Sequence, residues 1–247
     1  MSGTRIVMWS GPRNLSTAMM RSFGARADTR VVDEPFYAAF LAATGIDHPM
    51  REAVIAAGET DWDQVAAACA APPPAGMIRY EKHMTHHMLD GVPLDWLEGA
   101  AIAFLIRDPR AVAGSYATKR EAFTLEDLGI ARQAALFDHC TALLGRPPPV
   151  VDADDIRRDP AGTLSLLCAA LGVAYDPAML HWPAGPRESD GVWGAHWYGA
   201  VNRSTGFAPP ESLRVSDPGL EALIAPGRAL YERLAETALG RSGRGAA

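Results

Sequence analysis

The sequence predicts a three-layer α/β/α fold in which a central, mostly parallel five-stranded sheet lies between two layers of helices. Strand-like and helix-like segments alternate five times along the 247 residues, an order typical of a parallel sheet covered on both faces. Residues 100–106 (AAIAFLI) are apolar on both faces of a strand, as expected at the centre of such a sheet. No repeat or linker divides the chain, so we expect one domain over residues 1–240 and a disordered tail over residues 241–247.

The strands are expected where short apolar runs end in charged or turn-forming residues. RIVMW is the first of these runs, TRVVD the second, GMIRYE the third and PVVD the last. Such runs have the length of strands and are shorter than most helices. We therefore expect strands at residues 5–9, 29–33, 76–81, 100–106 and 149–152.

The helices are expected between these strands, and several carry start or stop signals. Asp61 is a helix cap, Pro109 suits the first turn of a helix, and Gly172 is a typical C-terminal stop. Residues 175–215 are rich in Gly, Pro and Trp, and we expect them to be irregular. The helices are predicted at residues 18–27, 36–43, 61–71, 93–98, 109–120, 125–144, 160–171 and 218–239, with a further one inside residues 45–58.

Composition and charge exclude several classes of function. The net charge is −6, which argues against a nucleic-acid-binding face, and no apolar stretch approaches the about 20 residues of a membrane span. The three cysteines form no C-x-x-C pair and lie in apolar stretches, and the seven histidines lack metal-ligand spacing. We expect a cytoplasmic protein with no metal, no nucleic-acid partner and no membrane partner. A local pocket for a small polyanion stays compatible with this charge.

The loop after the first strand carries the first candidate site. A glycine turn leading into a helix start presents backbone N–H groups to an anion, and an arginine and two hydroxyls stand beside them. A plain strand-to-helix turn with a hydroxyl cap is an equal alternative. The P-loop pattern G-x-x-x-x-G-K-[ST] is absent. The candidate residues are Gly11, Pro12, Arg13, Asn14, Leu15, Ser16 and Thr17.

The segment after the fourth strand carries a second candidate. Arg107 stands where the strand ends, Pro109 opens a helix, and Ser115 lies about two turns into it. Because ligands of parallel sheets bind beyond the carboxyl ends of the strands, Arg107 and Ser115 are placed to hold a second phosphate. The alternative is a helix capped by Asp108 with solvated arginines.

Three segments in this order resemble the PAPS-dependent sulfotransferase family. They are GPRNLSTA after the first strand, RDPRAVAGS after the fourth and DDIRRDPAGTLSLLCAALGV after the fifth, and the second is the most specific. The similarity spans about residues 5 to 175, and the later segment HWYGAVNRSTGF is similar to the family more weakly. The segments EPFY and KHMTHH make it similar to a bacterial branch of the family.

The resemblance implies a fold like that of P-loop nucleotide kinases, and PAPS as the sulfuryl donor with no metal required. The first loop, with Arg13 as its cation, would hold the 5′-phosphosulfate, and Arg107 and Ser115 would hold the 3′-phosphate. The family's third phosphate segment is a C-terminal basic glycine loop. Here its place is matched only weakly, by Arg203, Ser204, Thr205 and Gly206.

The reaction implied is an in-line displacement at sulfur, which needs cations for the leaving group and a base for the acceptor. Two of the 23 basic residues are lysines, and one of them, Lys82, follows the third strand, where the family often has a lysine. Arg13 is the other candidate cation. Glu34, after the second strand, is slightly favoured as the base over His83 or His87; His86 completes the same cluster. Each of these residues also has a purely structural interpretation.

An aromatic cluster late in the chain, together with Phe36, suggests an acceptor pocket. Trp193, Trp197 and Tyr198 would line the pocket for a small-molecule acceptor, or they would pack the core of an irregular segment. A homodimer is compatible with the sequence. Two other functions stay open: a P-loop kinase or NTPase, and a non-catalytic protein that binds a 3′-phosphonucleotide on the same fold.

Overall fold

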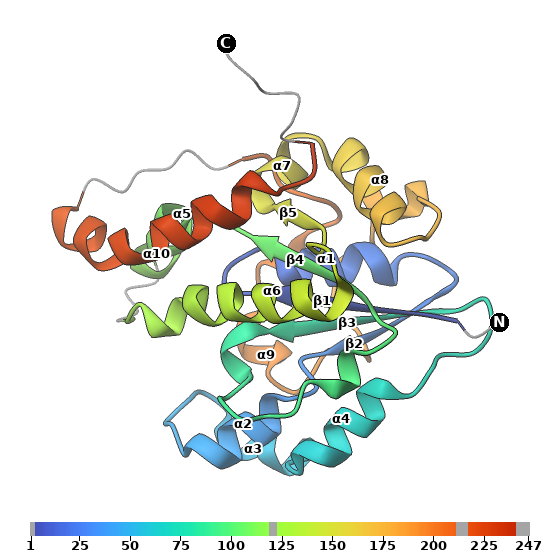
Figure 1. Cartoon of the computed structure of the whole chain (residues 1–247), viewed down its shortest axis with the longest axis horizontal. Coiled ribbons are helices and arrows are strands. Elements are labelled where there is room, and N and C mark those ends of the chain that lie inside the picture. Colours follow the sequence, from blue (N-terminus) through green and yellow to red (C-terminus); the bar gives the residue numbers. More distant parts are fainter. Residues whose placement is uncertain (1–2, 119–122, 211–216, 241–247) are drawn as a thin grey trace.

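A computed structural model of the chain describes residues 3–118, 123–210 and 217–240. Its centre is one five-stranded sheet in the order β2-β3-β1-β4-β5, and every pairing is parallel, as the sequence predicts. Figure 1 shows the sheet crossing the middle of the molecule. The strands are β1 (Thr4–Ser10), β2 (Thr29–Asp33), β3 (Ile78–Met84), β4 (Ala101–Ile106) and β5 (Val150–Asp152).

The α-helices of the described chain connect these strands and close the fold. The longest is α10, and α9 is a single short turn. Five segments of 3-10 helix lie among them: η1 (Thr85–His87), η2 (Asp95–Leu97), η3 (Glu126–Leu128), η4 (Pro177–Leu180) and η5 (Val201–Arg203). The α-helices are α1 (Ser16–Gly24), α2 (Tyr37–Thr44), α3 (Arg51–Ala57), α4 (Trp62–Ala70), α5 (Pro109–Thr118), α6 (Ile130–Leu144), α7 (Ala153–Arg158), α8 (Pro160–Ala170), α9 (Gly194–Trp197) and α10 (Pro218–Glu236).

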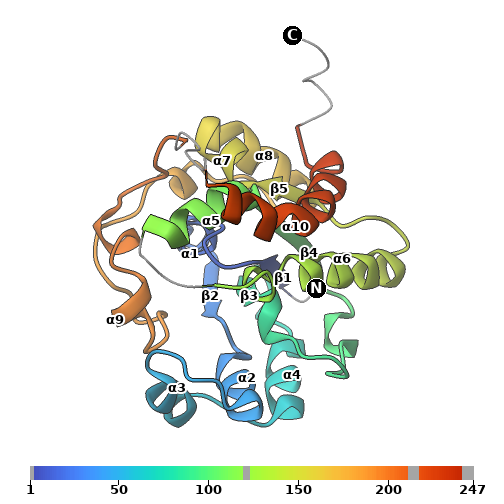
Figure 2. The same cartoon turned by 90° about the vertical axis from the view of Figure 1, so that its left-hand side faces the viewer.

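The two faces of the sheet are buried under different helices. On one face, α1, α2 and α8 pack against alternate residues of β1 and β3, such as Met8 and Tyr80. On the other face, α4, α6 and α10 pack against Val7 and Trp9. Figure 2 shows α1 and α8 on one side of the strands and α4 and α6 on the other. The three-layer arrangement follows because alternate side chains of a strand point to opposite faces.

Several details differ from the sequence expectation. The helix expected at residues 93–98 forms only the 3-10 helix η2. Strand β3 continues to Met84, because its position between β1 and β2 gives Lys82 a pairing partner on each side, Met8 and Asp33. The expected helix at residues 125–144 is broken at Gly129, whose φ of 66° is left-handed. The short helix α7 was not expected; Asp152 caps it by accepting from the N–H of Asp154 at 2.8 Å.

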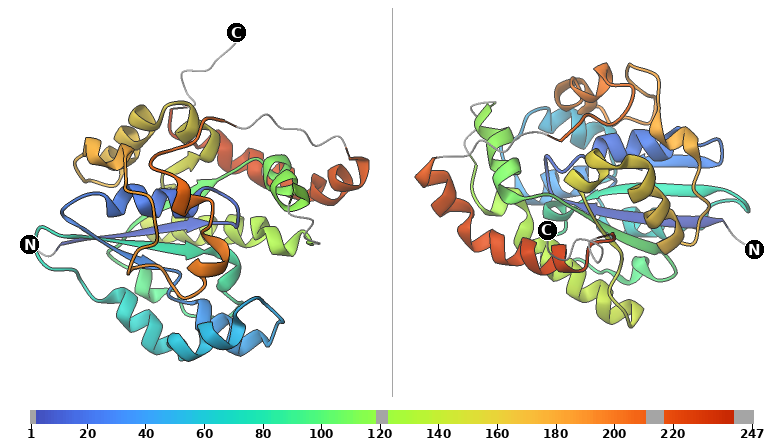
Figure 3. Two further views of the ribbon diagram at one scale, coloured as in Figure 1. Left: turned by 180° about the vertical axis from the view of Figure 1, so that it is seen from behind. Right: turned by 90° about the horizontal axis from the view of Figure 1, so that it is seen from above.

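The segment after α8 runs back across the α1 side of the sheet, as Figure 3 shows. We call residues 186–202 of this segment the strap. Two buried groups of α1 and β2 hold it: the Arg21 guanidinium binds both carboxylate oxygens of Asp190 at 2.5 and 2.7 Å, and Asp33 accepts from the N–H of Gly191 at 3.2 Å. The strap therefore brings late residues to the carboxyl ends of the strands.

Some expectations fall on other parts of the chain. The predicted tail, residues 241–247, lies outside the described residues. The three cysteines are free and buried, as expected. Within the described chain, no helix is both long and apolar enough to cross a membrane.

Candidate active site

The loop between β1 and α1 has the geometry of an anion cradle. Arg13 and Leu15 have φ values of 59° and 70°, in the left-handed region, just before α1 begins at Ser16. Alternation of this kind makes concave nests of backbone N–H groups, and the helix start adds its dipole. Gly11 is required where it stands, since a Cβ there would lie 2.7 Å from the Leu128 carbonyl oxygen. The side-chain amide of Asn14 is buried. It donates to the Pro12 carbonyl oxygen and accepts from the Gly11 N–H, and these two bonds hold the loop closed.

Arg107 joins this loop from the end of β4. It is 6% exposed, and its Nη1 donates to the carbonyl oxygen of Arg13 at 2.8 Å. The two predicted phosphate segments therefore meet at one edge of the sheet. Ser115 lies on α5, which begins at Pro109 directly after β4, and Thr17 lies in the first turn of α1. Both are half-buried.

The side chain of Arg13 lies between two aromatic rings. Its guanidinium carbon is 5.1 Å from the centre of the Tyr116 ring and 5.7 Å from that of Trp197. Trp197 is a predicted pocket residue, and the strap carries it to this place. Cation–π contacts of this kind hold a guanidinium without using its N–H donors.

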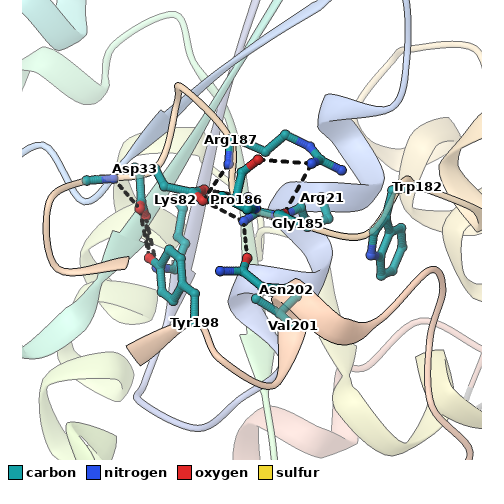
Figure 4. Close-up of polar contacts among 12 residues, drawn as sticks. Arg21, Asp33, Lys82, Trp182, Gly185, Pro186, Arg187, Tyr198, Val201 and Asn202 are labelled. Atoms are coloured by element: carbon teal, nitrogen blue, oxygen red, sulfur yellow. Dashed lines mark hydrogen bonds and ion pairs between the residues drawn. The ribbon is translucent and has the colours of Figure 1, made fainter. Parts of the chain in front are cut away.

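Lys82 is buried in a network of acidic and phenolic groups. Its Nζ donates to Asp33 Oδ1 at 2.9 Å, to the Tyr198 hydroxyl at 2.6 Å, and to Glu34 Oε1 by a short contact. Figure 4 shows Lys82, Asp33 and Tyr198 converging. An ammonium has three N–H donors, and these partners use all three. Burial acts to lower the pKa of Lys82, but Asp33 and Glu34 outweigh it and hold that pKa well above its usual value.

Tyr198 ties this network to the strap. Its hydroxyl donates to Asp33, with oxygens at 2.7 and 2.9 Å, and accepts from Lys82 and from Trp193 Nε1 at 3.1 Å. Trp193 and Tyr198 are 9% and 4% exposed, so they pack within the core rather than line an open pocket. Of the aromatic cluster predicted from sequence, Trp197 is the half-exposed member at the cradle.

Glu34 follows β2 with a left-handed φ of 46°. A non-glycine residue in this conformation is strained, and here its N–H donates to the Lys82 carbonyl at 2.9 Å while Lys82 Nζ holds its Oε1. The other oxygen, Oε2, is 3.9 Å from His87 Nε2. Burial raises the pKa of Glu34, and the charge of Lys82 opposes that rise.

His87 lies beside Glu34, in the 3-10 helix η1 that follows β3. Its ring stacks on Tyr37, with centroids 4.5 Å apart, and on Phe40 at 4.9 Å. Burial, reinforced by the neighbouring His86 and Lys82, holds the pKa of His87 well below its usual value, so this imidazole is neutral at neutral pH. Burial likewise lowers the pKa of His86 to about 4.

Sequence reasoning did not single out Tyr37 and His48. The Tyr37 hydroxyl and His48 Nδ1 are 2.5 Å apart, and the His48 ring is 5.5 Å from the Trp197 ring. These contacts connect α2, the following loop and the strap. No local pattern could have found them, because the partners are brought together only by the fold.

Two candidate residues lie on the opposite face of the sheet. His83 Nε2 is 3.0 Å from Glu81 Oε2, and the His83 ring packs against Trp9, Trp96 and Phe36. Phe36 is 1% exposed in the same apolar cluster. The structure therefore brings neither residue to Glu34 Oε2 or Arg13, since strand alternation turns His83 away from Lys82.

The late segment Arg203–Gly206 is also placed elsewhere. Trp182 Nε1 donates to Ser204 Oγ at 3.1 Å, and a Cβ on Gly206 would lie 3.1 Å from the Leu180 carbonyl oxygen. These contacts set the segment beside η4, which packs on α1. Among the contacts described, none joins Arg203, Ser204, Thr205 or Gly206 to the cradle. The contacts therefore do not support the weak match of these residues to the family's third phosphate segment.

A second polar cluster lies behind β3. The potential metal-ligand atoms of Cys69, Glu81 and His83 all lie within 4.8 Å of one another. A cavity of about 380 Å³ reaches Cys69 and Glu81. Glu81 already binds Arg79 Nε at 2.7 Å and His83, and burial raises the pKa of Cys69 to about 12, which keeps the thiol protonated. The cluster has the spacing of a metal site, but its carboxylate is engaged by the protein's own donors.

The geometry agrees with comparisons to known proteins. A profile of the family described as "Sulfotransferase domain" matches residues 4–234. Two Arabidopsis thaliana proteins, named branched-chain-amino-acid aminotransferase-like proteins 1 and 2, are 40% identical over 204 residues and 37% identical over 211 residues. These alignments cover 82% and 85% of this chain. The chain spans only 36% and 37% of the length of those relatives.

Solved structures show the same fold at low identity. The sulfotransferase domain of the Synechococcus PCC 7002 olefin synthase superposes with a TM-score of 0.57 at 18% identity, covering 95% of each chain. A sulfotransferase from Alicyclobacillus acidocaldarius superposes with a TM-score of 0.55 at 15% identity, covering 99% of this chain and 100% of that one. The α/β fold with an all-parallel sheet is thus that of bacterial sulfotransferase domains.

Proposed function

Because the chain belongs to the sulfotransferase domain family, we propose that it transfers a sulfuryl group from PAPS to a hydroxyl or amine of a small-molecule acceptor. One observation supports this most strongly: the anion cradle, the buried Arg107 and the carboxylate of Glu34 share one edge of the sheet. The reaction needs this combination, because the sulfuryl donor carries two phosphate groups that must be bound and the acceptor must lose a proton.

The residues present fit PAPS. The left-handed loop at Arg13–Leu15 and the start of α1 would hold the 5′-phosphosulfate, and Arg107, with Ser115, would hold the 3′-phosphate. When bound, PAPS supplies the sulfuryl group, and its bisphosphate is the leaving group. Arg13, stacked between Tyr116 and Trp197, is the cation of the loop for the charge that develops on that leaving group.

Glu34 is the general base in this proposal. Its Oε1 is fixed by Lys82, while Oε2 faces His87 Nε2 across 3.9 Å. Burial raises the pKa of Glu34 toward the range in which a carboxylate can take a proton and release it again. His83, which lies on the other face, has no role in this step.

Lys82 acts as a positioning residue rather than as a ligand of the sulfuryl group. Its three donors are already used by Asp33, Glu34 and Tyr198. Lys82 holds both Glu34 Oε1 and the strap residue Tyr198. It therefore fixes the position of the base relative to the strap, which also carries Trp197.

The proposal is tested first by binding. In a thermal-shift titration, adenosine 3′,5′-bisphosphate is expected to stabilise the protein much more than ADP at the same concentration. Arg13→Ala is expected to weaken this binding. Equal stabilisation by both nucleotides, with ATP turnover that depends on magnesium, would favour a P-loop NTPase instead.

Transfer is tested next with ³⁵S-labelled PAPS and a panel of alcohols, amines and sugars. Glu34→Gln is expected to lower the transfer rate by about 10²–10⁴-fold and to leave the affinity for adenosine 3′,5′-bisphosphate unchanged. Unchanged turnover in this variant would remove Glu34 from the role of base. Tight binding of the bisphosphate without transfer to any acceptor would favour a non-catalytic 3′-phosphonucleotide-binding protein.

A further inference from the structure

The spacing of Glu34 Oε2 and His87 Nε2 is that of two groups bridged by one atom, and we call this pair of groups the seat. Glu34 Oε2 and His87 Nε2 are 3.9 Å apart, too far for a direct hydrogen bond. An oxygen or nitrogen atom about 2.8 Å from each of them would hydrogen-bond to both at once. Under the proposed function, on which this inference rests, that atom is the nucleophile.

The orientation of the His87 ring is fixed by its surroundings. The ring is 3% exposed and is stacked between Tyr37, with an interplanar angle of 8°, and Phe40, with an angle of 25°. Its Nε2 faces Glu34. Its Nδ1 is buried and has no hydrogen-bond partner among the described residues.

This environment selects the tautomer of the neutral imidazole. A proton on Nδ1 would be a buried N–H without an acceptor, and such donors are rarer in folded proteins than unpaired acceptors. A proton on Nε2 would point at the carboxylate of Glu34, which attracts it. The Nε2–H tautomer follows, so the seat has one hydrogen-bond donor, His87 Nε2, and one acceptor, Glu34 Oε2.

We propose that the acceptor atom of this protein is a hydroxyl oxygen and not an amine nitrogen. A hydroxyl has one donor and two lone pairs: it can donate to Glu34 Oε2, accept from His87 Nε2–H and keep a lone pair for attack. A neutral primary amine has two N–H groups and a single lone pair. If that lone pair accepts from His87 it is lost to attack, and if it attacks, the N–H of His87 faces an atom that cannot accept.

The transfer step then balances as follows. The free lone pair of the hydroxyl oxygen forms the new S–O bond, while the bond from sulfur to the bridging oxygen of the phosphosulfate breaks. The electron pair of that bond stays on the bridging oxygen, which leaves as part of adenosine 3′,5′-bisphosphate. The hydroxyl proton goes to Glu34 Oε2, and the product is a sulfate ester.

The first test reads the tautomer directly and needs no substrate. Long-range ¹H–¹⁵N NMR spectra of the ¹⁵N-labelled protein at pH 7.5 distinguish the two neutral tautomers, and the His87→Phe variant assigns the signal. We expect the Nε2–H form of His87, with or without adenosine 3′,5′-bisphosphate. The Nδ1–H form would overturn the proposal, because the seat would then accept an amine.

The second test compares two acceptors of one shape. Phenol and aniline are both uncharged at pH 7.5 and differ in the reacting atom alone. With ³⁵S-labelled PAPS, we expect phenol to be sulfated at least about tenfold faster than aniline, the ratio that one mismatched hydrogen bond gives. Aniline reacting as fast as phenol would overturn the proposal.

Matched variants separate this inference from the proposed function. His87→Phe keeps the stacking with Tyr37 and Phe40 but removes the donor, and we expect kcat/KM for phenol to fall about tenfold. His139→Phe, on the exposed side of α6, is expected to keep it within about threefold, since His139 is not part of the seat. If the bisphosphate does not bind at all, the proposed function fails, while the NMR result still decides which donor His87 presents.

Discussion

The two faces of β3 carry buried polar networks of similar composition but different completeness. On one face, Lys82 binds Asp33, Glu34 and Tyr198; on the other, Glu81 binds Arg79 and His83. Both oxygens of Glu81 have partners within 3.0 Å, whereas Glu34 Oε2 has its contact with His87 at 3.9 Å. A network in which every group is paired holds the fold together, whereas a network with one carboxylate oxygen beyond hydrogen-bond distance of its partner can also bind a substrate.

The comparison is tested most severely by Lys82→Met. The change leaves Asp33 and Glu34 buried without their cation, and we expect the free energy of unfolding to fall by about 3–5 kcal/mol. Urea denaturation at pH 7.5 measures it. The double variant Lys82→Met with Asp33→Asn is the control: it removes one charge of each sign and is expected to recover part of the loss. A loss below about 1 kcal/mol in the single variant would contradict the network.

Glu81→Gln is the matching test of the other face. It removes the charge that pairs with Arg79 and His83, and we expect unfolding to become easier by about 2–3 kcal/mol. The affinity for adenosine 3′,5′-bisphosphate, measured by calorimetry, is expected to stay within about twofold, because this network does not reach the cradle. A large loss of affinity would show that the two faces are coupled.

Acid is expected to lower the stability of the protein through His86, which lies beside the candidate site. Burial lowers the pKa of His86 to about 4, below the value near 6.5 of the unfolded chain. The stability linked to this residue is therefore complete above pH 6.5 and is lost as the pH falls toward 4. We expect wild-type protein to lose about 2 kcal/mol more between pH 7 and pH 5 than His86→Phe does. Equal losses in parallel urea titrations would mean that His86 is not held neutral.

The smallest effect on ligand affinity is expected at Trp197, where the strap contacts Arg13 of the cradle. Trp197→Leu removes one of the two rings that stack on Arg13, a contact worth about 0.5–1 kcal/mol. The affinity for adenosine 3′,5′-bisphosphate should fall about two- to fivefold. Trp62→Leu, a half-buried tryptophan that stacks on Phe36 on the other face, should leave this affinity unchanged. Equal effects of the two substitutions would point to a general loss of stability.

Local patterns in the sequence are sufficient to find the layers and most of the strand ends. Apolar runs of strand length, proline and glycine stops, and the cradle segment before α1 are all features of neighbouring residues. The end of β3 was placed three residues early, because an apolar pattern cannot register a strand that continues through Lys82, His83 and Met84. Pairing with β1 supports all three of these residues, and pairing with β2 supports Lys82 as well.

The partners within the site could not be found in this way. Asp33 and Tyr198 are 165 residues apart, and Tyr37 meets His48 and His87 through the packing of α2. His83 and His87 were equal candidates in the sequence, four positions apart in one cluster. His83 lies within β3 and packs into the cluster on one face, whereas His87 lies in the 3-10 helix η1, where the chain turns toward α2 on the other face.

The sequence by itself determined the order of strands and helices, the position of the cradle at a strand end, and the family that the chain resembles. Those features depend on residue types within a few positions of one another. The tertiary structure alone decided which face each residue of β3 presents, that Lys82 uses all its donors on the protein, and that Glu34 and His87 face each other. Burial and pairing across distant segments set these outcomes, since each depends on which other element packs against the residue.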